Sequence, residues 1–240
     1  MRSSRLRPAV CLAILALAAP AVHAQTVEEI VAKNIEAKGG LETLKGTNSV
    51  RTTGTGTMQG SEVTMTSLTK RPYFVRNEMS MAGQMMIMGS DGETVWMVAP
   101  GLPAKVLPPG PQTDAMKQTS QIDSPLLDYK ARGTKVELGE PLTEGGRRFD
   151  HLIVRQKTGP PMHYYLDAAT GLESKMVIEV EEQGQPMKME MRFSDFRKVD
   201  GRTVPFAVTQ FVNGSQVSEI KFEKIEFNVP MEDSLFRIPK

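Results

Sequence analysis

Few residues in this sequence are of the types that most catalytic and metal-binding sites require. Cys11 is the only cysteine, and the 240 residues contain only three histidines. A lone cysteine cannot form an intrachain disulfide, and zinc sites built from several thiolates are excluded as well. The formal charge is only +1, since 29 basic side chains nearly balance 28 acidic ones. A chain so close to neutrality lacks the basic surface that nucleic-acid binding requires.

Residues 1–24 are expected to be a secretory signal peptide. Arginines near the start precede an apolar run at residues 9–19, and Val22-His23-Ala24 suits cleavage before Gln25. The run is too short to span a bilayer, which takes about 20 residues. Cleavage would remove Cys11, which excludes a cysteine lipid anchor, and would change the formal charge to about −2. An exported, thiol-free chain indicates a soluble periplasmic protein.

Residues 25–240 are expected to form a single domain. Thr26 is a plausible N-cap for a helix over residues 26–45, broken near Gly39-Gly40. From residue 49 the apolar residues recur with a period of two, which is typical of strands. The expected strands cover residues 49–58, 61–70, 73–81, 84–90, 94–99, 134–140, 147–157, 161–167, 172–183, 186–195, 203–212 and 216–227.

The connections between these strands are short, so sequential strands should be antiparallel neighbours. Asn213-Gly214 predicts a type I′ hairpin turn. The apolar phase changes near residues 223–224, which predicts a β-bulge. Many short strands after one helix predict a mainly β fold of the α+β class, in which a large curved antiparallel sheet forms a half-open β-barrel. The N-terminal helix and a helical or looping lid would cover an apolar cavity.

Residues 100–133 interrupt the strand pattern and form a lid-like insert. Five prolines between residues 100 and 111 exclude a central strand, and residues 114–121 have room for one or two helical turns. A connection this long in a compact domain is more often functional than a simple linker. The insert either covers one face of the sheet or is an ordered connector without a gating role.

No catalytic motif is recognisable in the sequence. It has no nucleophile elbow, Walker loop, dinucleotide-binding glycine pattern or zinc-binding helix motif. His151 and His163 both lie within strand patterns, where a structural role is the simpler interpretation. We therefore expect no catalytic residues, no metal and no cofactor. A lipid hydrolase that uses His151 or His163 with a nearby carboxylate is the enzymatic alternative.

Methionines are dense in two stretches. Residues 187–193 alternate three methionines and Phe193 with charged residues, and residues 79–88 contain five more methionines. Methionine is flexible and polarisable, so these side chains suit either an adaptable ligand cavity or plain core. Thioethers also bind Cu(I). However, alternate residues of one strand lie about 6.6 Å apart, which is too far for adjacent sulfurs to converge, and no histidine accompanies either stretch.

Short motifs of turns and strand ends occur along nearly the whole chain after residue 24. They are Ala37-Lys38-Gly39-Gly40-Leu41, Arg71-Pro72, Asp91-Gly92-Glu93-Thr94-Val95-Trp96, Ser124-Pro125-Leu126-Leu127-Asp128-Tyr129, Tyr165-Leu166-Asp167, Thr170-Gly171-Leu172, Phe193-Ser194-Asp195-Phe196, Asp200-Gly201, Val204-Pro205-Phe206 and the end of the chain from Asn228. Together they resemble the outer membrane lipoprotein-sorting protein group of the LolA/LolB-like superfamily.

This resemblance implies a periplasmic carrier that binds acyl chains of a lipoprotein or lipid and moves them between envelope membranes. Inner-membrane donor and outer-membrane acceptor proteins are then its expected partners. A ligand-sensing scaffold of envelope stress signalling is the alternative within the superfamily. The residues expected to line the cavity are Met65, Met86, Met88, Trp96, Leu126, Leu127, Tyr129, Met187, Met189, Met191, Phe193 and Phe206.

Overall fold

The computed structural model of the protein describes residues 25–110, 113, 121–157, 159–182 and 185–239. The described chain forms two α-helices, α1 (Val27–Ala37) and α2 (Leu41–Lys45), and the 3-10 helix η1 (Asp233–Phe236). The expected signal peptide, the turn at residues 183–184 and nearly all of the helical turns expected at 114–121 lie outside the described residues.

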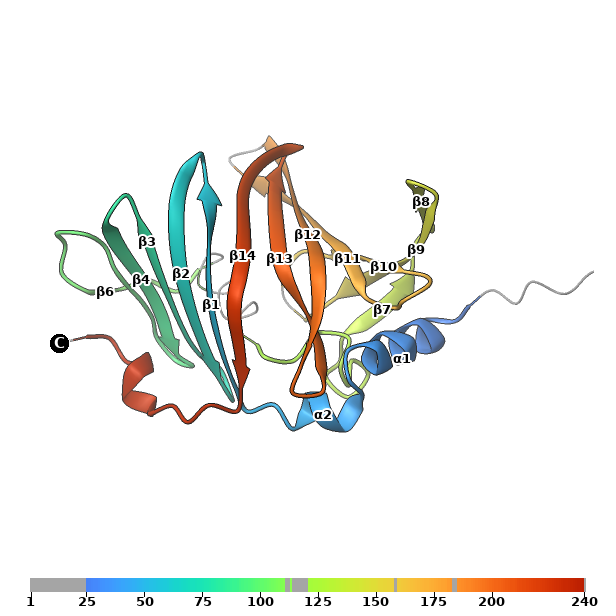
Figure 1. Ribbon diagram of the computed structural model, residues 1–240, viewed down its shortest axis with the longest axis horizontal. Helices are drawn as coiled ribbons and strands as arrows, with labels where there is room; N and C mark the ends of the chain where they lie inside the picture. Colours follow the sequence, from blue (N-terminus) through green and yellow to red (C-terminus); the bar gives the residue numbers. More distant parts are fainter. Residues whose placement is uncertain (1–24, 111–112, 114–120, 158, 183–184, 240) are drawn as a thin grey trace, which may run out of the picture.

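The remaining elements are strands of one antiparallel sheet (Figure 1). The strands are β1 (Ser49–Met58), β2 (Ser61–Lys70), β3 (Phe74–Met81), β4 (Gln84–Asp91), β5 (Val95–Val98), β6 (Lys105–Val106), β7 (Lys135–Leu138), β8 (Leu142–Glu144), β9 (Arg147–Arg155), β10 (Met162–Asp167), β11 (Glu173–Glu182), β12 (Gln185–Val199), β13 (Arg202–Val212) and β14 (Ser215–Phe227). Their order is β6-β5-β4-β3-β2-β1-β14-β13-β12-β11-β10-β9-β7, with β8 paired to β9.

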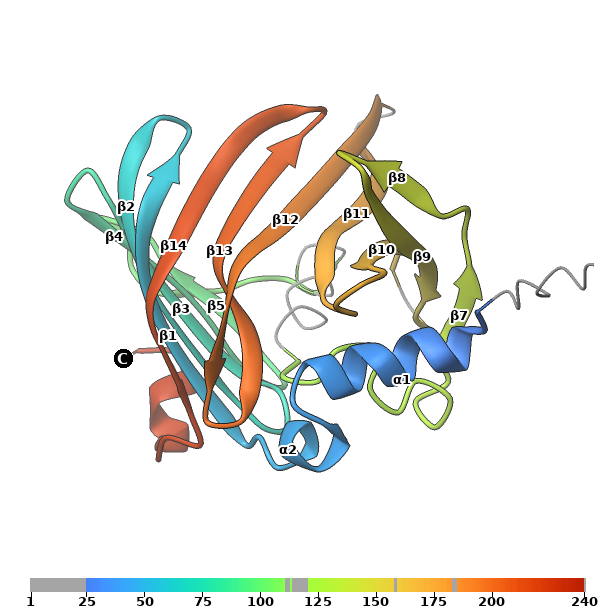
Figure 2. The same cartoon turned by 45° about the vertical axis from the view of Figure 1, so that its right-hand side comes forward.

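The sheet is strongly curved and does not close (Figure 2). Its end strands β6 and β7 are not paired with each other among the described strands. The expected mainly β fold with a half-open barrel is therefore confirmed. The helix α1 lies across the concave side of the sheet near β7 and β9, and the described residues of the insert after 120 lie beside it (Figure 2).

The N-terminal helix begins with the predicted cap. The Thr26 hydroxyl accepts a hydrogen bond from the Glu29 backbone N–H at 3.2 Å, and the Glu29 carboxylate accepts one from the Thr26 N–H at 2.8 Å. This reciprocal arrangement is a capping box. Gly39 and Gly40 have positive φ and separate α1 from α2, as their sequence predicts. The break turns α2 toward the β12–β13 hairpin and lets the chain enter β1.

Two predicted irregularities of the sheet are also confirmed. Asn213 and Gly214 have φ of +49° and +81°, the left-handed pair that a type I′ turn requires. The ladder between β1 and β14 shifts register between Thr53 and Gly54, which pair with Lys224 and Phe222. Glu223 is the extra residue, so the bulge falls at the position where the apolar phase changes.

The concave side of β9–β11 is packed against α1. Ile30 and Val31 of the helix form one cluster with residues of these strands and with Leu126 of the insert. Leu152 and Val154 of β9 are fully buried there. The apolar stripe of α1 thus covers this end of the sheet and makes it the main core.

A second packed region lies on the opposite, convex face, where the C-terminal segment with η1 returns along β3 and β4 (Figure 1). The Trp96 indole N–H donates to the Phe236 carbonyl at 2.7 Å, and both side chains are fully buried. Phe74 lies with its ring centroid 5.4 Å from that of Phe236. A Cβ on Gly89 would overlap the indole ring, so only glycine lets Trp96 lie flat on β4.

The sequence pattern misses β6, β8, η1 and the length of one strand. Strands β6 and β8 have two and three residues, too few to show a period. The strand expected at 186–195 continues to Val199 as β12. Asp195 has φ of +53° within it, and its carboxylate accepts two hydrogen bonds from Arg197. This local kink breaks the alternation that marked the strand in the sequence.

Candidate ligand-binding face

Cross-strand register places methionines of three neighbouring strands side by side on the concave face. Met65 of β2 lies opposite Met79 of β3, and Met79 lies opposite Met86 of β4. Directly opposite residues in an antiparallel pair have Cβ atoms about 4.5–5.5 Å apart. The three side chains therefore form one row, which we call the methionine row.

The apolar surface continues from this row across the middle of the sheet. Val63 of β2 lies opposite Gly56, which lies opposite Ile220 of β14. Ile220 lies opposite Val208, and Val208 opposite Phe193 of β12. The concave face is thus apolar without interruption along this line from β2 to β12.

Strand β12 presents its methionines to the same face. Met187, Met189, Met191 and Phe193 are partly buried, whereas Lys188 and Arg192 between them are exposed. Met191 and Phe193 pack against the core beneath α1. The β12 side chains therefore connect the covered end of the concave face with its open end.

Exposure along the concave face shows where a ligand could enter. Met81 and Met86, near the Ala82-Gly83 turn, are 38% and 41% exposed, whereas Leu152 beneath α1 is 0% exposed. Large apolar side chains with this much contact with water are the ones that a ligand could cover. The accessible part of the face is the part that carries the methionine row.

The structure brings most of the sequence-predicted lining residues to this face. On it by register are Met65, Met86, Met88, Met187, Met189, Met191, Phe193 and Phe206. Leu126 and Tyr129 of the insert belong to the packing beneath α1, and Leu127 is buried beside them. Phe206 is 6% exposed and is covered by the Arg197 guanidinium at 4.3 Å from the ring.

Trp96 lies on the other face. It pairs with Gly89, which is opposite Arg76, and so shares the convex face with η1. The cause is that all four residues of β5 are apolar, so alternation does not indicate an inward side. Met79 was not among the expected lining residues. The two-residue turn at Ala82-Gly83 is the signal that places it opposite Met86.

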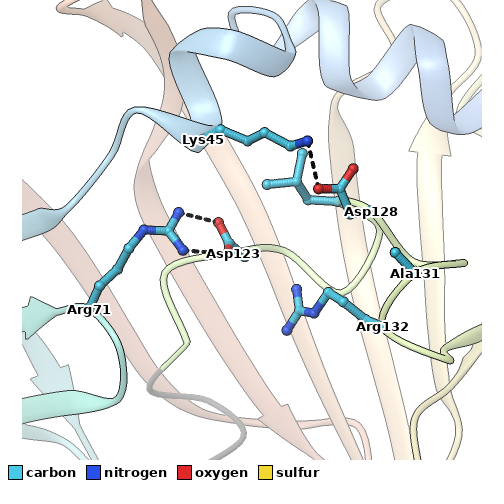
Figure 3. A pocket seen from close by; sticks show the side chains of 7 residues that line it. Lys45, Arg71, Asp123, Asp128, Ala131 and Arg132 are labelled. Carbon is cyan, nitrogen blue, oxygen red and sulfur yellow. Dashed lines mark hydrogen bonds and ion pairs between the residues drawn. The ribbon is translucent and has the colours of Figure 1, made fainter.

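A pocket of about 420 Å³ lies where α2, the β2–β3 turn and the insert meet (Figure 3). It is lined by Lys45, Arg71, Asp123, Leu127, Asp128, Ala131 and Arg132. The Arg71 guanidinium donates to both Asp123 oxygens at 2.6 Å, and Lys45 Nζ lies 2.7 Å from Asp128 Oδ2. Asp123 raises the pKa of Arg71, and Asp128 raises the pKa of Lys45. These ion pairs fasten the insert to the sheet and to α2.

Comparisons with known proteins bear on the fold. No family model matches the sequence, and no curated protein matches it significantly. Among solved structures, an outer membrane lipoprotein-sorting protein domain from Vibrio parahaemolyticus matches with a TM-score of 0.55 at 12% identity, covering 87% of this chain and 94% of that one. A LolA superfamily protein from Nitrosomonas europaea matches with a TM-score of 0.56 at 12% identity, covering 89% and 98%. The chain has the LolA-like fold.

A third structure matches over a similar length. A DUF1329 family protein from Desulfovibrio piger has a TM-score of 0.60 at 10% identity, with 88% of this chain and 97% of that one covered. The suspected resemblance to LolA-like proteins is thus confirmed at the level of fold. Among the described residues, no helix is both long and apolar enough to cross a bilayer.

The two histidines lie on the convex face of the LolA-like sheet, away from the methionine row. His151 Nε2 and His163 Nδ1 are 2.9 Å apart, and the His151 ring stacks on Tyr165 at 4.5 Å. Burial, with a smaller contribution from the charge of His163, lowers the pKa of His151. Neither imidazole contacts a carboxylate in the described part of the chain. The hydrolase alternative therefore finds no acid–base pair at these positions.

Proposed function

We propose that this protein is a periplasmic carrier that binds acyl chains of a lipoprotein or lipid on its concave face. It would move them between envelope membranes without a catalytic step. The LolA-like fold supports this proposal, since one structure with that fold is named as an outer membrane lipoprotein-sorting protein domain. Residues 1–24 would direct export, and an inner-membrane donor and an outer-membrane acceptor would hand over and receive the cargo.

The observation that carries the proposal is the uninterrupted apolar surface from β2 to β12 with a half-exposed end. Burial of each cargo methylene contributes about 0.8 kcal/mol. Val63 and Ile220 are already buried, so an acyl chain that covers the exposed methionines at the open end could supply most of the binding free energy. Methionines at the open end would adapt to chains of different shape because their side chains are unbranched and flexible.

The insert would form one wall of this binding site. Leu126 and Tyr129 pack beside the concave face, and the Arg71–Asp123 pair holds their segment against the sheet. Acyl chains would lie between this wall and the methionines of β2–β4. The lining residues predicted from the sequence, apart from Trp96, remain the proposed contacts.

A matched pair of substitutions tests the proposal. Met86 and Met85 are neighbours on β4 with similar exposure, 41% and 48%, but they point to opposite faces. Met86→Asp introduces a charge into the proposed acyl site, whereas Met85→Asp places the same charge on the convex face. Fluorescent fatty-acid titration should show binding by the wild type and by Met85→Asp, and at least tenfold weaker binding by Met86→Asp.

Native mass spectrometry of protein purified from its own envelope would identify the cargo class. A co-purifying phospholipid or lipoprotein that is lost in Met86→Asp supports the carrier. Equal binding by the two folded variants contradicts the assignment of the concave face. Met189→Asp with Met191→Asp extends the test to β12, with circular dichroism as the folding control, because Met191 also packs against the core.

A further inference from the structure

The methionine row has a chemistry that acyl-chain binding does not use. Thioether sulfurs are soft ligands that select Cu(I). Spacing along one strand keeps sulfurs apart, but the row runs across strands. Met79 has Met65 on one side and Met86 on the other, each in direct register. The outer two side chains therefore need only lean toward Met79 to bring three sulfurs together.

We propose that Met65, Met79 and Met86 form a binding site for a single Cu(I) ion. Three thioethers would supply a neutral, all-sulfur coordination sphere. Met81 and Met88 flank the row diagonally on the same face and are available as a fourth ligand. The inference is independent of the carrier proposal, because it rests on sulfur ligation and not on apolar area.

The surroundings of the row favour a soft ion over a hard one. Apart from Met81 and Met88, the flanking residues on the same face are Val63, Ser67, Asn77 and Gln84, and Gly54 continues the row beyond Met65. None of these carries a charge. No group of three His, Asp or Glu side chains suited to hold a metal occurs among the residues that the structure describes. The row therefore lacks the thiolate, imidazole and carboxylate ligands that bind Zn²⁺, and the oxygen ligands that bind Mg²⁺.

Access and competition also favour the site. Met86 is 41% exposed, so an ion from solution reaches the row directly. The only cysteine of the sequence, Cys11, lies in the expected signal peptide. A mature chain without thiols has no stronger soft ligand to draw Cu(I) away from the methionines.

The test is Met65→Leu/Met79→Leu/Met86→Leu, with Met85→Leu as the control on the convex face. Leucine keeps the side chain apolar and of similar volume, so the fold should be retained, which circular dichroism checks. Cu(I), kept reduced anaerobically with ascorbate, is titrated against a chromophoric chelator. The wild type and Met85→Leu should bind one ion, and the triple variant should bind more than about 100-fold more weakly. X-ray absorption should show sulfur-only ligation in the wild type.

Two results would overturn the site. One is Cu(I) affinity of the triple variant equal to that of the wild type, and the other is a wild type that cannot compete with the chelator at all. Fatty-acid titration of the wild type separates the two proposals. Lipid binding by the wild type, together with loss of Cu(I) binding in the triple variant, supports a metal site on a lipid-binding face. If the wild type binds Cu(I) but no lipid, the result supports the metal site and contradicts the carrier proposal.

Discussion

Two parts of one sheet face are filled in different ways. Beneath α1, strands β9 and β10 bring Leu152, Val154 and Leu166 to the concave face, and all three are at most 1% exposed. On β3 and β4 four positions of the concave face are methionines, and two of them, Met81 and Met86, are 38% and 41% exposed. The same backbone architecture thus carries a tightly packed surface at one end and an adaptable one at the other.

The covering elements explain the difference. At the β9–β10 end, α1 packs on the concave face, so these side chains need shapes that fit the helix. At the β3–β5 end, η1 packs on the convex face, where Trp96 and Phe236 are fully buried. A sheet can be stabilised from either side. Covering β3–β5 from behind leaves the methionine row free for a ligand.

The largest expected effect comes from comparing one substitution at each end of the concave face. Leu152→Ala should lower the free energy of unfolding by about 2–5 kcal/mol, because it leaves a cavity beneath α1. Met86→Ala should lower it by less than about 1 kcal/mol, because its side chain is already partly in water. Urea denaturation of both variants measures the two values. A comparable loss in both would mean that the β3–β4 end is core.

A smaller effect concerns the ion pair that fastens the insert. Asp123→Asn removes the charge that Arg71 contacts twice, and both side chains are partly exposed, so the cost should be about 1 kcal/mol or less. Trypsin should then cleave after Lys130 and Arg132 up to about fivefold faster. The control is Asp195→Asn, which breaks a pair with Arg197 within β12. Unchanged cleavage in Asp123→Asn would show that other contacts hold the insert.

The smallest expected effect concerns His151, which lies on the convex face at the end of the sheet that α1 covers. Burial lowers the pKa of His151, so the unfolded chain takes up this proton at higher pH than the folded one. Stability should therefore fall as the pH drops below about 6.5, the ordinary histidine value. His151→Asn should show a shallower fall in urea denaturation between neutral and mildly acidic pH. The same slope in both proteins would assign the acid sensitivity to other groups.

Local patterns in the sequence predict most of the sheet. The bounds of β1 and β2 coincide with the expected 49–58 and 61–70, and the bulge in β14 lies where the apolar phase changes. These features depend on residues that are neighbours in the chain. The convex position of Trp96 depends instead on Phe236, 140 residues away, and β5 is apolar on both faces. The spacing of apolar residues within β5 therefore cannot predict which face Trp96 occupies.

In the candidate site, too, local sequence patterns predict some features and miss those that depend on distant residues. Alternation in residues 187–193 predicts their shared face, and the structure agrees. The pairing of Met79 with Met86 could have been derived from a two-residue turn, but Ala82 has positive φ, which is unusual for alanine, so the turn is not obvious. The pocket with Lys45, Arg71 and Asp123 combines three distant segments. Its residues carry no motif that would connect them in the sequence.

The unpaired end strands of the sheet have a mechanical consequence. A closed barrel has a circumference set by its strand number and stagger. Here β6 and β7 end the sheet without a ladder between them in the described chain. No ladder between the end strands therefore fixes how tightly the described sheet curls. The elements that bridge its concave side, α1 and the insert held by the Arg71–Asp123 pair, take over that role.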